Sequence, residues 1–174
     1  FPEVLVTIFS CYRNLFQKKW IKKLININFS KKISQAMEVQ IINRLRENEI
    51  GKKIPKLLPI VDCISSNVRS QYEDSPYPMW TKIDRRKNHF SNIKGLSNAE
   101  ILVAGCGTGR QSIYTAVNNP KSRILAIDLS LNSLAYAKRK SDELEIYNID
   151  YLHGDILNLK KLNRNFDFIE SVGV

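Results

Sequence analysis

The most informative stretch of the sequence reads Ile101-Leu-Val-Ala-Gly-Cys-Gly-Thr-Gly109. Its four apolar residues, 101–104, predict a buried strand, and the glycine-rich residues 105–109 predict a turn. Residues 110–118 fit a helix, which Asn119-Pro120 ends. Glycines at alternate positions let the backbone come within contact distance of a ligand, and the helix after them offers free N–H groups. We therefore expect a ligand site at this turn.

The same alternation continues to the end of the sequence. Further strands are predicted at residues 123–127, 146–152 and 166–172, a helix at 130–143 with Ser130 as its cap, and a short turn or helix at 155–162. Strands and helices that alternate at this spacing predict an α/β fold with a parallel, doubly wound sheet. The fourth strand would then be an exposed apolar edge.

The N-terminal residues show helical periodicity instead. Helices are predicted at residues 3–24, at 30–47 with Ser30 as cap and Gly51 after the end, and at 56–70 with Pro59 in the first turn. Their apolar stripes are typical of packing surface rather than of a cofactor site. We therefore expect residues 1–70 to form an all-helical segment, the end of an array of helical repeats.

A connector is predicted between the helical segment and the sheet. Residues 71–80 contain two prolines and the aromatic residues Tyr72, Tyr77 and Trp80, which predicts an ordered but irregular segment. Residues 81–99 are polar and basic, as expected of a linker with one short helix. The expected domains are thus a helical segment at 1–70, a connector at 71–99 and a sheet domain at 100–174.

The composition excludes several classes of protein. The chain has 174 residues, of which 43% are hydrophobic, so it is not a disordered chain. No apolar run approaches the ~18 residues of a membrane span. The sequence opens on Phe1-Pro2 without a signal peptide, which suggests a fragment. The three cysteines, Cys11, Cys63 and Cys106, form no disulfide or zinc pattern, and we expect a cytoplasmic protein.

The net charge of +10 is unevenly distributed. Residues 1–100 carry 18 basic and 9 acidic side chains, whereas residues 101–174 carry 9 and 8. This excess fits either contact with an acidic partner such as nucleic acid or a general richness in Lys, Ile and Asn. No RNA-binding signature accompanies the charge, so both explanations stay open.

Two aspartates follow predicted strands at the same edge of the sheet. Asp128 ends the second strand, where a carboxylate can accept hydrogen bonds from both hydroxyls of a ribose. The alternative is a solvated charge beside the next helix N-terminus. Asp155 follows the third strand and could accept from an adenine amino group, with the next backbone N–H reaching a ring nitrogen. Its alternative role is a helix cap. His153 is expected to be structural.

These residues carry a resemblance to a known family. The segments Ile101–Gly109, Ala126–Asp128, Gly154–Ile156 and Phe166–Gly173 resemble motifs one to four of the class I S-adenosylmethionine-dependent methyltransferases. Residues 71–80 resemble a QYExxPYPxW signature of bacterial methyltransferases that carry tetratricopeptide repeats. The resemblance implies a Rossmann-like sheet in the order 3-2-1-4-5-7-6, of which this sequence supplies strands one to four.

The resemblance also implies roles for individual residues. The loop residues Gly105, Cys106, Gly107, Thr108 and Gly109 would pass the methionine part of the cofactor. Asp128 would hold the ribose with Leu129 against the adenine, and Asp155 and Ile156 would read the adenine edge. Glu170 to Gly173, with Ser171 and Val172 among them, would line the cofactor near the methyl group, mainly through backbone. Ala104 departs from the family, since many members have Asp or Glu there.

The implied activity is transfer of a methyl group from S-adenosylmethionine by direct in-line displacement. The protein then chiefly supplies proximity and orientation. Tyr72, Tyr77 and Trp80 either form a lid over the sulfonium or pin the helical segment to the sheet. No catalytic base and no metal site are assigned, and the oligomeric state is not predicted.

Several alternatives stay open. The acceptor is unidentified, with a protein or small molecule favoured over nucleic acid, and no membrane partner is expected. A catalytically inactive methyltransferase-like interaction module is the main rival. An NAD-dependent enzyme fits Asp128 but not the glycine spacing, because Arg110 occupies the place of the third glycine.

Overall fold

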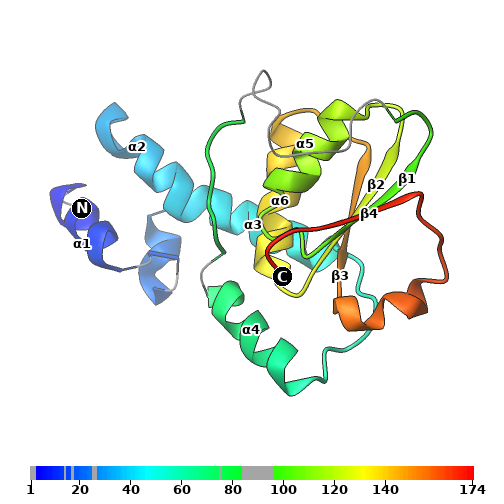
Figure 1. Cartoon of the computed structure of the whole chain (residues 1–174). Coiled ribbons are helices and arrows are strands. Elements are labelled where there is room, and N and C mark those ends of the chain that lie inside the picture. Colours follow the sequence, from blue (N-terminus) through cyan, green and yellow to red (C-terminus); the bar gives the residue numbers. More distant parts are fainter. Residues whose placement is uncertain (1–2, 14, 17, 25–26, 75, 84–95) are drawn as a thin grey trace. The chain divides into compact units, whose positions relative to one another are not determined.

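The structure is a computed structural model, and it describes residues 3–13, 15–16, 18–24, 27–74, 76–83 and 96–174. Two compact units make up the chain, Phe1–Glu49 and Ile50–Val174, and each is described here by itself (Figure 1). The short helix expected in the 81–99 linker falls largely outside the described residues.

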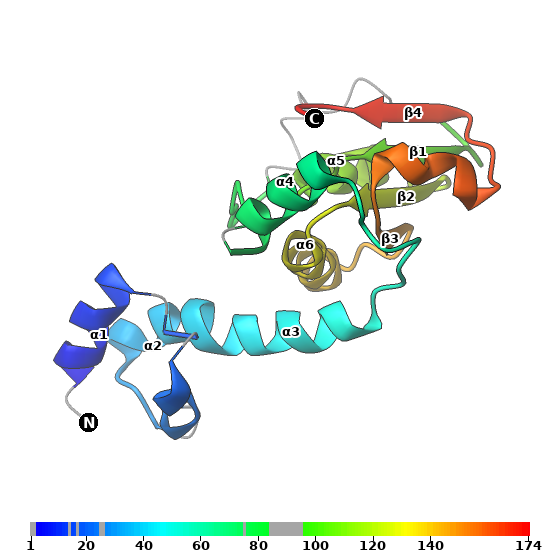
Figure 2. The ribbon, with the colours of Figure 1, turned by 90° about the horizontal axis from the view of Figure 1, so that it is seen from below.

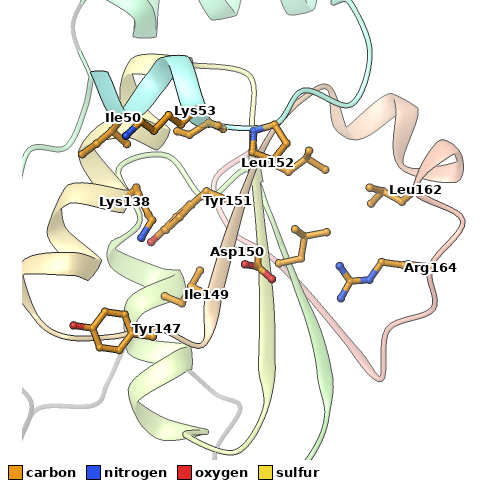
Figure 3. A pocket seen from close by; sticks show the side chains of 13 residues that line it. Ile50, Lys53, Lys138, Tyr147, Ile149, Asp150, Tyr151, Leu152, Leu162 and Arg164 are labelled. Atoms are coloured by element: carbon orange, nitrogen blue, oxygen red, sulfur yellow. The ribbon is translucent and has the colours of Figure 1, made fainter. Parts of the chain in front are cut away.

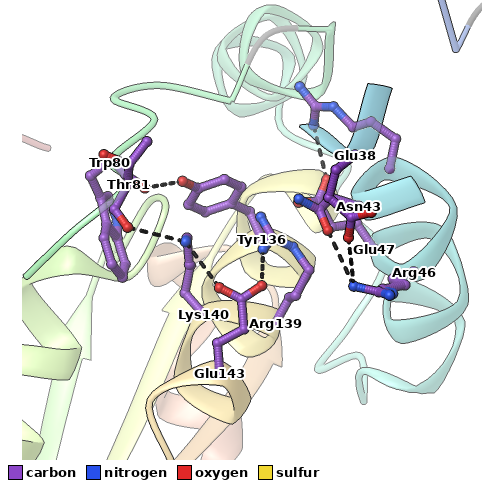
Figure 4. A network of polar contacts seen from close by, with 11 residues as sticks. Glu38, Asn43, Arg46, Glu47, Trp80, Thr81, Tyr136, Arg139, Lys140 and Glu143 are labelled. Atoms are coloured by element: carbon purple, nitrogen blue, oxygen red, sulfur yellow. Dashed lines mark hydrogen bonds and ion pairs between the residues drawn. The ribbon is translucent and has the colours of Figure 1, made fainter. Parts of the chain in front are cut away.

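The first unit is helical. Its elements are α1 (Glu3–Tyr12), the 3-10 helix η1 (Lys19–Lys23), α2 (Lys31–Met37), the π-helical turn η2 (Glu38–Ile42) and the start of α3 (Asn43–Lys53). Its core consists of Val6, Leu15, Ile21, Leu24, Met37 and Ile41. Ion pairs join Arg44 to Glu47 and Arg46 to Glu38 along the helical surface (Figure 4).

The prediction of one helix over residues 3–24 is wrong. Helix α1 ends at Tyr12, and the chain resumes helical structure only at Lys19. Leu15 and Leu24 are nine residues apart, so a continuous α-helix would place them on opposite faces. Breaking the helix allows both side chains to enter the same core.

The predicted helix ends at Ser30 and Gly51 also need correction. Ser30 precedes α2, but its side chain makes no capping bond, and its N–H donates to Glu3 Oε1 at 2.6 Å. Gly51 does not end a helix, because α3 continues to Lys53 and stops just before Pro55. A proline removes the helical conformation from the residue before it, which explains the later end.

The second unit contains a four-stranded parallel sheet. Its strands are β1 (Glu100–Ala104), β2 (Arg123–Asp128), β3 (Ile149–His153) and β4 (Phe168–Ser171), in the order β3-β2-β1-β4. Leu102 pairs with Leu125, which pairs with Asp150. The expected α/β class and the first four positions of the methyltransferase strand order are thereby confirmed.

Helices cover both faces of this sheet. Helices α5 (Arg110–Asn118) and α6 (Leu131–Glu143) pack on one face, where Val103 and Ala126 meet Ile113 and Leu134 (Figure 1). The 3-10 helix η3 (Ile156–Leu162) lies on the opposite face, over Leu102 and Leu125. Side chains alternate between the faces along each strand, so each apolar strand serves both cores.

The third N-terminal helix begins later than the pattern predicts. It is α4 (Cys63–Asp74) rather than residues 56–70, and Asp62 Oδ1 accepts from Ser65 N at 2.8 Å at its start. Residues 55–57 instead pair with the end of β3: Leu57 N donates to His153 O, and His153 N donates to Pro55 O, both at 2.9 Å. Helix α4 lies next to α6 (Figure 2).

The strand boundaries differ slightly from their predictions. The third strand starts at Ile149 rather than 146, since Glu145 has a positive φ of 58° and a turn occupies the residues after α6. The fourth strand covers Phe168–Ser171 rather than 166–172, and Phe166 packs against the η3 side of the core.

None of the helices in the described ranges is long and apolar enough to cross a membrane. Cys11 and Cys63 are exposed, Cys106 is buried, and all three thiols are free. Within the same ranges, no group of His, Cys, Asp and Glu side chains is arranged to hold a metal ion.

Candidate functional site

The glycine-rich loop joins β1 to α5 and is fastened to β2. The backbone N–H groups of Gly105 and Cys106 both donate to Ile127 O, at 2.9 and 3.0 Å. The glycines at 105, 107 and 109 have φ values of 73°, 52° and 80°. Only glycine adopts such values without strain, so the alternating spacing has a conformational reason.

The loop glycines have different surroundings. A Cβ on Gly109 would overlap the Ala137 methyl and lie 3.2 Å from its Cα, so Gly109 permits the close approach of the loop to α6. A Cβ on Gly107 would meet nothing nearer than Tyr77 O at 3.9 Å. Space beside the backbone at Gly107 is what a ligand-contacting loop requires.

Asp128 links this loop to the start of α6. Its Oδ2 accepts from Gly107 N at 2.7 Å, and its Oδ1 accepts from Ser130 N at 2.9 Å. Burial raises the pKa of Asp128, and these two N–H groups offset part of the rise. Each carboxylate oxygen retains a second lone pair, so the group can still accept hydrogen bonds from a diol.

Cys106 lies behind the same carboxylate. Burial, and next the charge of Asp128, raises the pKa of the Cys106 thiol well above its ordinary value. Because the thiolate is the reactive form, this shift disfavours a nucleophilic role for the buried Cys106 side chain.

Asp155 and Ile156 follow β3 at the same edge of the sheet. Asp155 is buried, and its Oδ1 accepts from Leu157 N at 2.9 Å as the cap of η3. The structure thus shows the capping role. A role in reading adenine stays a prediction, and Ile156, half-buried on the η3 side, lies beside the cap.

Ser171 and Val172 lie at the end of β4. Ser171 Oγ donates to Ala104 O at 3.2 Å, whereas Val172 is exposed. Their neighbour Glu170 accepts from Gln111 Nε2 at 2.5 Å and from Thr115 Oγ1 at 2.8 Å, so its carboxylate is directed to α5.

Hydrogen bonds join connector residues 76–80 to the glycine loop. Trp80 Nε1 donates to Thr108 O at 3.0 Å, and Thr108 Oγ1 donates to Pro78 O at 2.5 Å. Tyr136 Oη donates to Trp80 O, and the two rings meet edge to face with centroids 6.0 Å apart (Figure 4). These bonds show that Trp80 pins the connector to the sheet domain.

The two tyrosines of the connector are not pinned in this way. Tyr77 is 72% exposed and Tyr72 is 37% exposed. The backbone oxygen of Tyr77 lies near Gly107, and the Tyr77 side chain is exposed to solvent. A lid role for these two residues stays a prediction.

Two residues of this edge were missed as site residues. Glu73, at the end of α4, accepts from Leu131 N at 2.8 Å and from Asn132 N at 2.9 Å. His153 Nε2 donates to Leu129 O at 2.9 Å. The only sequence signal for Glu73 is its place in the QYExxPYPxW stretch, and His153 directly precedes Gly154-Asp155.

His153 is a neutral structural group, as expected. Burial lowers the pKa of His153, and its bond to the Leu129 carbonyl only partly offsets this. Since that carbonyl accepts, the Nε2 atom carries the proton. The ring therefore fixes the position of Leu129, the residue expected against adenine.

A separate cavity of about 570 Å³ lies along the outer edge of β3 (Figure 3). Its lining is partly apolar and includes three cationic side chains, Lys53, Lys138 and Arg164, and one carboxylate, Asp150. Two of these cations already pair with acids, Lys138 with Asp142 and Arg164 with Glu100. None of the residues predicted for the cofactor site lines this cavity.

Comparison with known proteins finds similarity to methyltransferases over part of the chain. Residues 101–174 match a family described as "Methyltransferase domain". The demethylmenaquinone methyltransferase of Listeria welshimeri is 23% identical over 125 residues, 71% of this chain and 49% of that protein. The release factor glutamine methyltransferase of Flavobacterium psychrophilum is 37% identical over 79 residues, 45% of this chain and 27% of that protein.

Solved structures are also similar over part of the chain. PKMT2 from Rickettsia typhi, in complex with AdoHcy, shares 32% identity and a TM-score of 0.42, over 44% of this chain and 15% of that one. Phosphoethanolamine N-methyltransferase 1 of Haemonchus contortus shares 17% identity and a TM-score of 0.47, over 62% and 24%. The chain spans about half the length, or less, of the curated relatives it matches.

Proposed function

We propose that this chain, whose residues 101–174 belong to the methyltransferase domain family, takes part in S-adenosylmethionine-dependent methyl transfer. Class I methyltransferases use S-adenosylmethionine as their cofactor. The observation that carries the proposal is the half-buried Asp128 carboxylate, held between the Gly107 and Ser130 N–H groups with acceptor capacity left for a ribose.

The residues of this edge fit the cofactor. Asp128 would accept from the ribose hydroxyls, and the open backbone at Gly107 would let the methionine part pass the loop. His153 would hold Leu129 against the adenine, and Asp155 with Ile156 would meet the adenine edge. Ser171 and Val172 would border the methyl group at the end of β4.

The bound cofactor would supply an electrophilic methyl group on its sulfonium. The protein would then accelerate transfer mainly by holding that methyl group in line with the acceptor atom, which replaces a bimolecular encounter. Tyr72 and Tyr77, both with exposed rings, would close over the cofactor and exclude water. We assign no general base, since one is needed only where the acceptor must lose a proton.

The direct test is calorimetric titration of the full-length protein with S-adenosylmethionine. We expect saturable one-site binding that Asp128→Ala abolishes and that NADH does not reproduce. Asp167→Ala is the matched control, since Asp167 Oδ2 also accepts a backbone N–H, Glu100 N at 2.8 Å, at the other end of β1. Absence of binding by the folded wild-type protein would contradict the proposal.

The rival function is a cofactor-binding module without transferase activity. A panel of protein, small-molecule and RNA acceptors with a radiolabelled methyl donor separates the two. Transfer to any acceptor, lost in Asp128→Ala, supports the enzyme, and binding without transfer to the whole panel favours the module. A cytoplasmic location, the domain limits and an upstream repeat array remain part of this proposal.

A further inference from the structure

Helix α6 begins with an unusually complete set of partners for its free N–H groups. Ser130 N donates to Asp128 and Ser133 N donates to Ser130 Oγ at 3.1 Å. Leu131 N and Asn132 N, the two between them, both donate to the carboxylate of Glu73. The first N–H groups of a helix have no partner within the helix, so these external acceptors determine where its first turn lies.

Both the side chain and the backbone of Glu73 form hydrogen bonds with this turn. The Asn132 side-chain amide donates to the backbone O of Glu73 at 2.8 Å, while the Glu73 carboxylate accepts from the α6 backbone. A carboxylate at a helix N-terminus also interacts favourably with the helix dipole. The end of α4 and the start of α6 are therefore held together by backbone and side-chain bonds.

This turn directly follows the residues proposed to bind the ribose and adenine of the cofactor. Asp128 and Leu129 directly precede it, and the carbonyl of Leu129 is held from the other side by His153. Burial chiefly, and to a smaller extent the negative charge of Glu73, raises the pKa of Asp128. The negative charge of Glu73 therefore reaches the Asp128 carboxylate.

We propose that Glu73 is a positioning residue for the cofactor, which fixes the path of residues 128–132 so that Asp128 presents its carboxylate to the ribose. This inference rests on the proposed function. In this proposal Glu73 acts through α6 rather than by touching the cofactor, since its two oxygens accept from Leu131 N and Asn132 N. Its removal would free the first turn of α6 and displace the ribose acceptor.

The test uses the full-length protein with two probes, S-adenosylhomocysteine and methylthioadenosine. Methylthioadenosine has the ribose and adenine but lacks the amino-acid end. Glu73→Ala should weaken both probes by the same factor, about tenfold, as expected for loss of about 1.4 kcal/mol. Glu73→Gln keeps one acceptor oxygen and should cost about threefold.

Two further variants separate positioning from general destabilisation. Asp62→Ala removes the cap at the other end of α4 and should lower the melting temperature without changing probe affinity. In an Asp128→Asn background, Glu73→Ala should change affinity less than twofold, because the group it positions is already impaired. Hydrogen exchange of residues 129–135 should accelerate in Glu73→Ala without any ligand.

The outcomes distinguish the two proposals. If the wild-type protein binds neither probe, the proposed function and the role of Glu73 both fail. If the wild-type protein binds and Glu73→Ala leaves its affinity unchanged, only the positioning role fails. A full tenfold loss in the Asp128→Asn background, or an equal loss in Asp62→Ala, would show a structural effect and would also overturn it.

Discussion

The sheet core at residues 101–156 and an extended connector, residues 50–74 and 76–83, contribute to the same candidate site in two different ways. The core supplies the glycine loop, Asp128 and Asp155 from the ends of consecutive strands. The connector supplies Glu73, Tyr77 and Trp80 through contacts with residues far along the chain. Trp80 and Thr108 are 28 positions apart, and Glu73 and Leu131 are 58 apart.

The difference shows how one half of a site can be predicted from sequence while the other half cannot. Strand-turn-helix units place their loops at one edge of a parallel sheet whatever else the chain does. A connector has no such rule, since its position depends on individual side chains that meet only after the sheet has formed. Mutations in each region test whether the core is stable independently of the connector and whether the connector depends on its contacts with the core.

The largest effect is expected at Gly109. Gly109→Ala should lower the free energy of unfolding by about 3 kcal/mol or more, because it adds overlap with Ala137 to a left-handed backbone. Gly107→Ala is the matched control, with φ of 52° but open space, and should cost only about 1–2 kcal/mol. Urea unfolding measures both. Equal losses would show that the close contact between Gly109 and Ala137 does not limit the stability of the core.

A pH effect is expected at His153, where core and connector meet. Its pKa is lowered in the folded state, so protonation favours unfolding, and stability is fully present above about pH 6.5. Stability should decline as the pH falls from there through the lowered pKa, by at most about 1.4 kcal/mol per unit.

The control for this effect is His153→Gln, which keeps an N–H donor for Leu129 O but does not titrate. The decline should be smaller in the variant when unfolding is followed across this pH range. An identical pH profile in both proteins would assign the effect to other groups. Glu73, Lys56 and Arg69 are the charged groups that influence His153 from the connector.

A smaller loss is expected at Trp80. Trp80→Phe keeps an aromatic ring against Tyr136 but removes the donor to Thr108 O, which should cost about 1 kcal/mol in urea unfolding. Tyr136→Phe removes the hydrogen bond that Tyr136 Oη donates to Trp80 O. The double variant should lose less than the sum of the two single losses. Strict additivity would mean that these two hydrogen bonds of Trp80 do not form a cooperative unit.

The smallest effect on stability is expected at Tyr77. Because its side chain is 72% exposed, Tyr77→Ala should change the free energy of unfolding by less than about 0.5 kcal/mol. If the ring closes on the cofactor, affinity for S-adenosylmethionine should fall nevertheless. Tyr147→Ala, equally exposed on the β3 edge, is the control and should change neither quantity.

Local patterns predicted the fold well where each residue's role is local. The apolar run 101–104, the cap at Ser130 and the strand ending at Asp128 all appear as predicted. The helix predicted over 3–24 failed because burial of Leu15 and Leu24 in one core overrides local periodicity. The start of α4 was missed because residues 55–57 pair with β3, a distant contact.

The candidate site was predictable to the same extent. Asp128 and the glycine loop follow from strand ends and turn chemistry, and the structure brings them together through Gly107 N. The hydrogen-bond partners of Glu73 and His153 could not be predicted, since a glutamate on a helix and a histidine after a strand have many possible partners. Only the folded chain shows that both hold the residues next to Asp128.

The pairing of residues 55–57 with the end of β3 has a consequence for synthesis. The partner in β3 emerges from the ribosome roughly 100 residues after Pro55, which corresponds to about 5–20 seconds of translation. During that interval the connector has no edge to pair with, and closing so long a loop is entropically costly. We therefore expect the connector to dock late, so that a nascent chain completes the candidate site only after its sheet has formed.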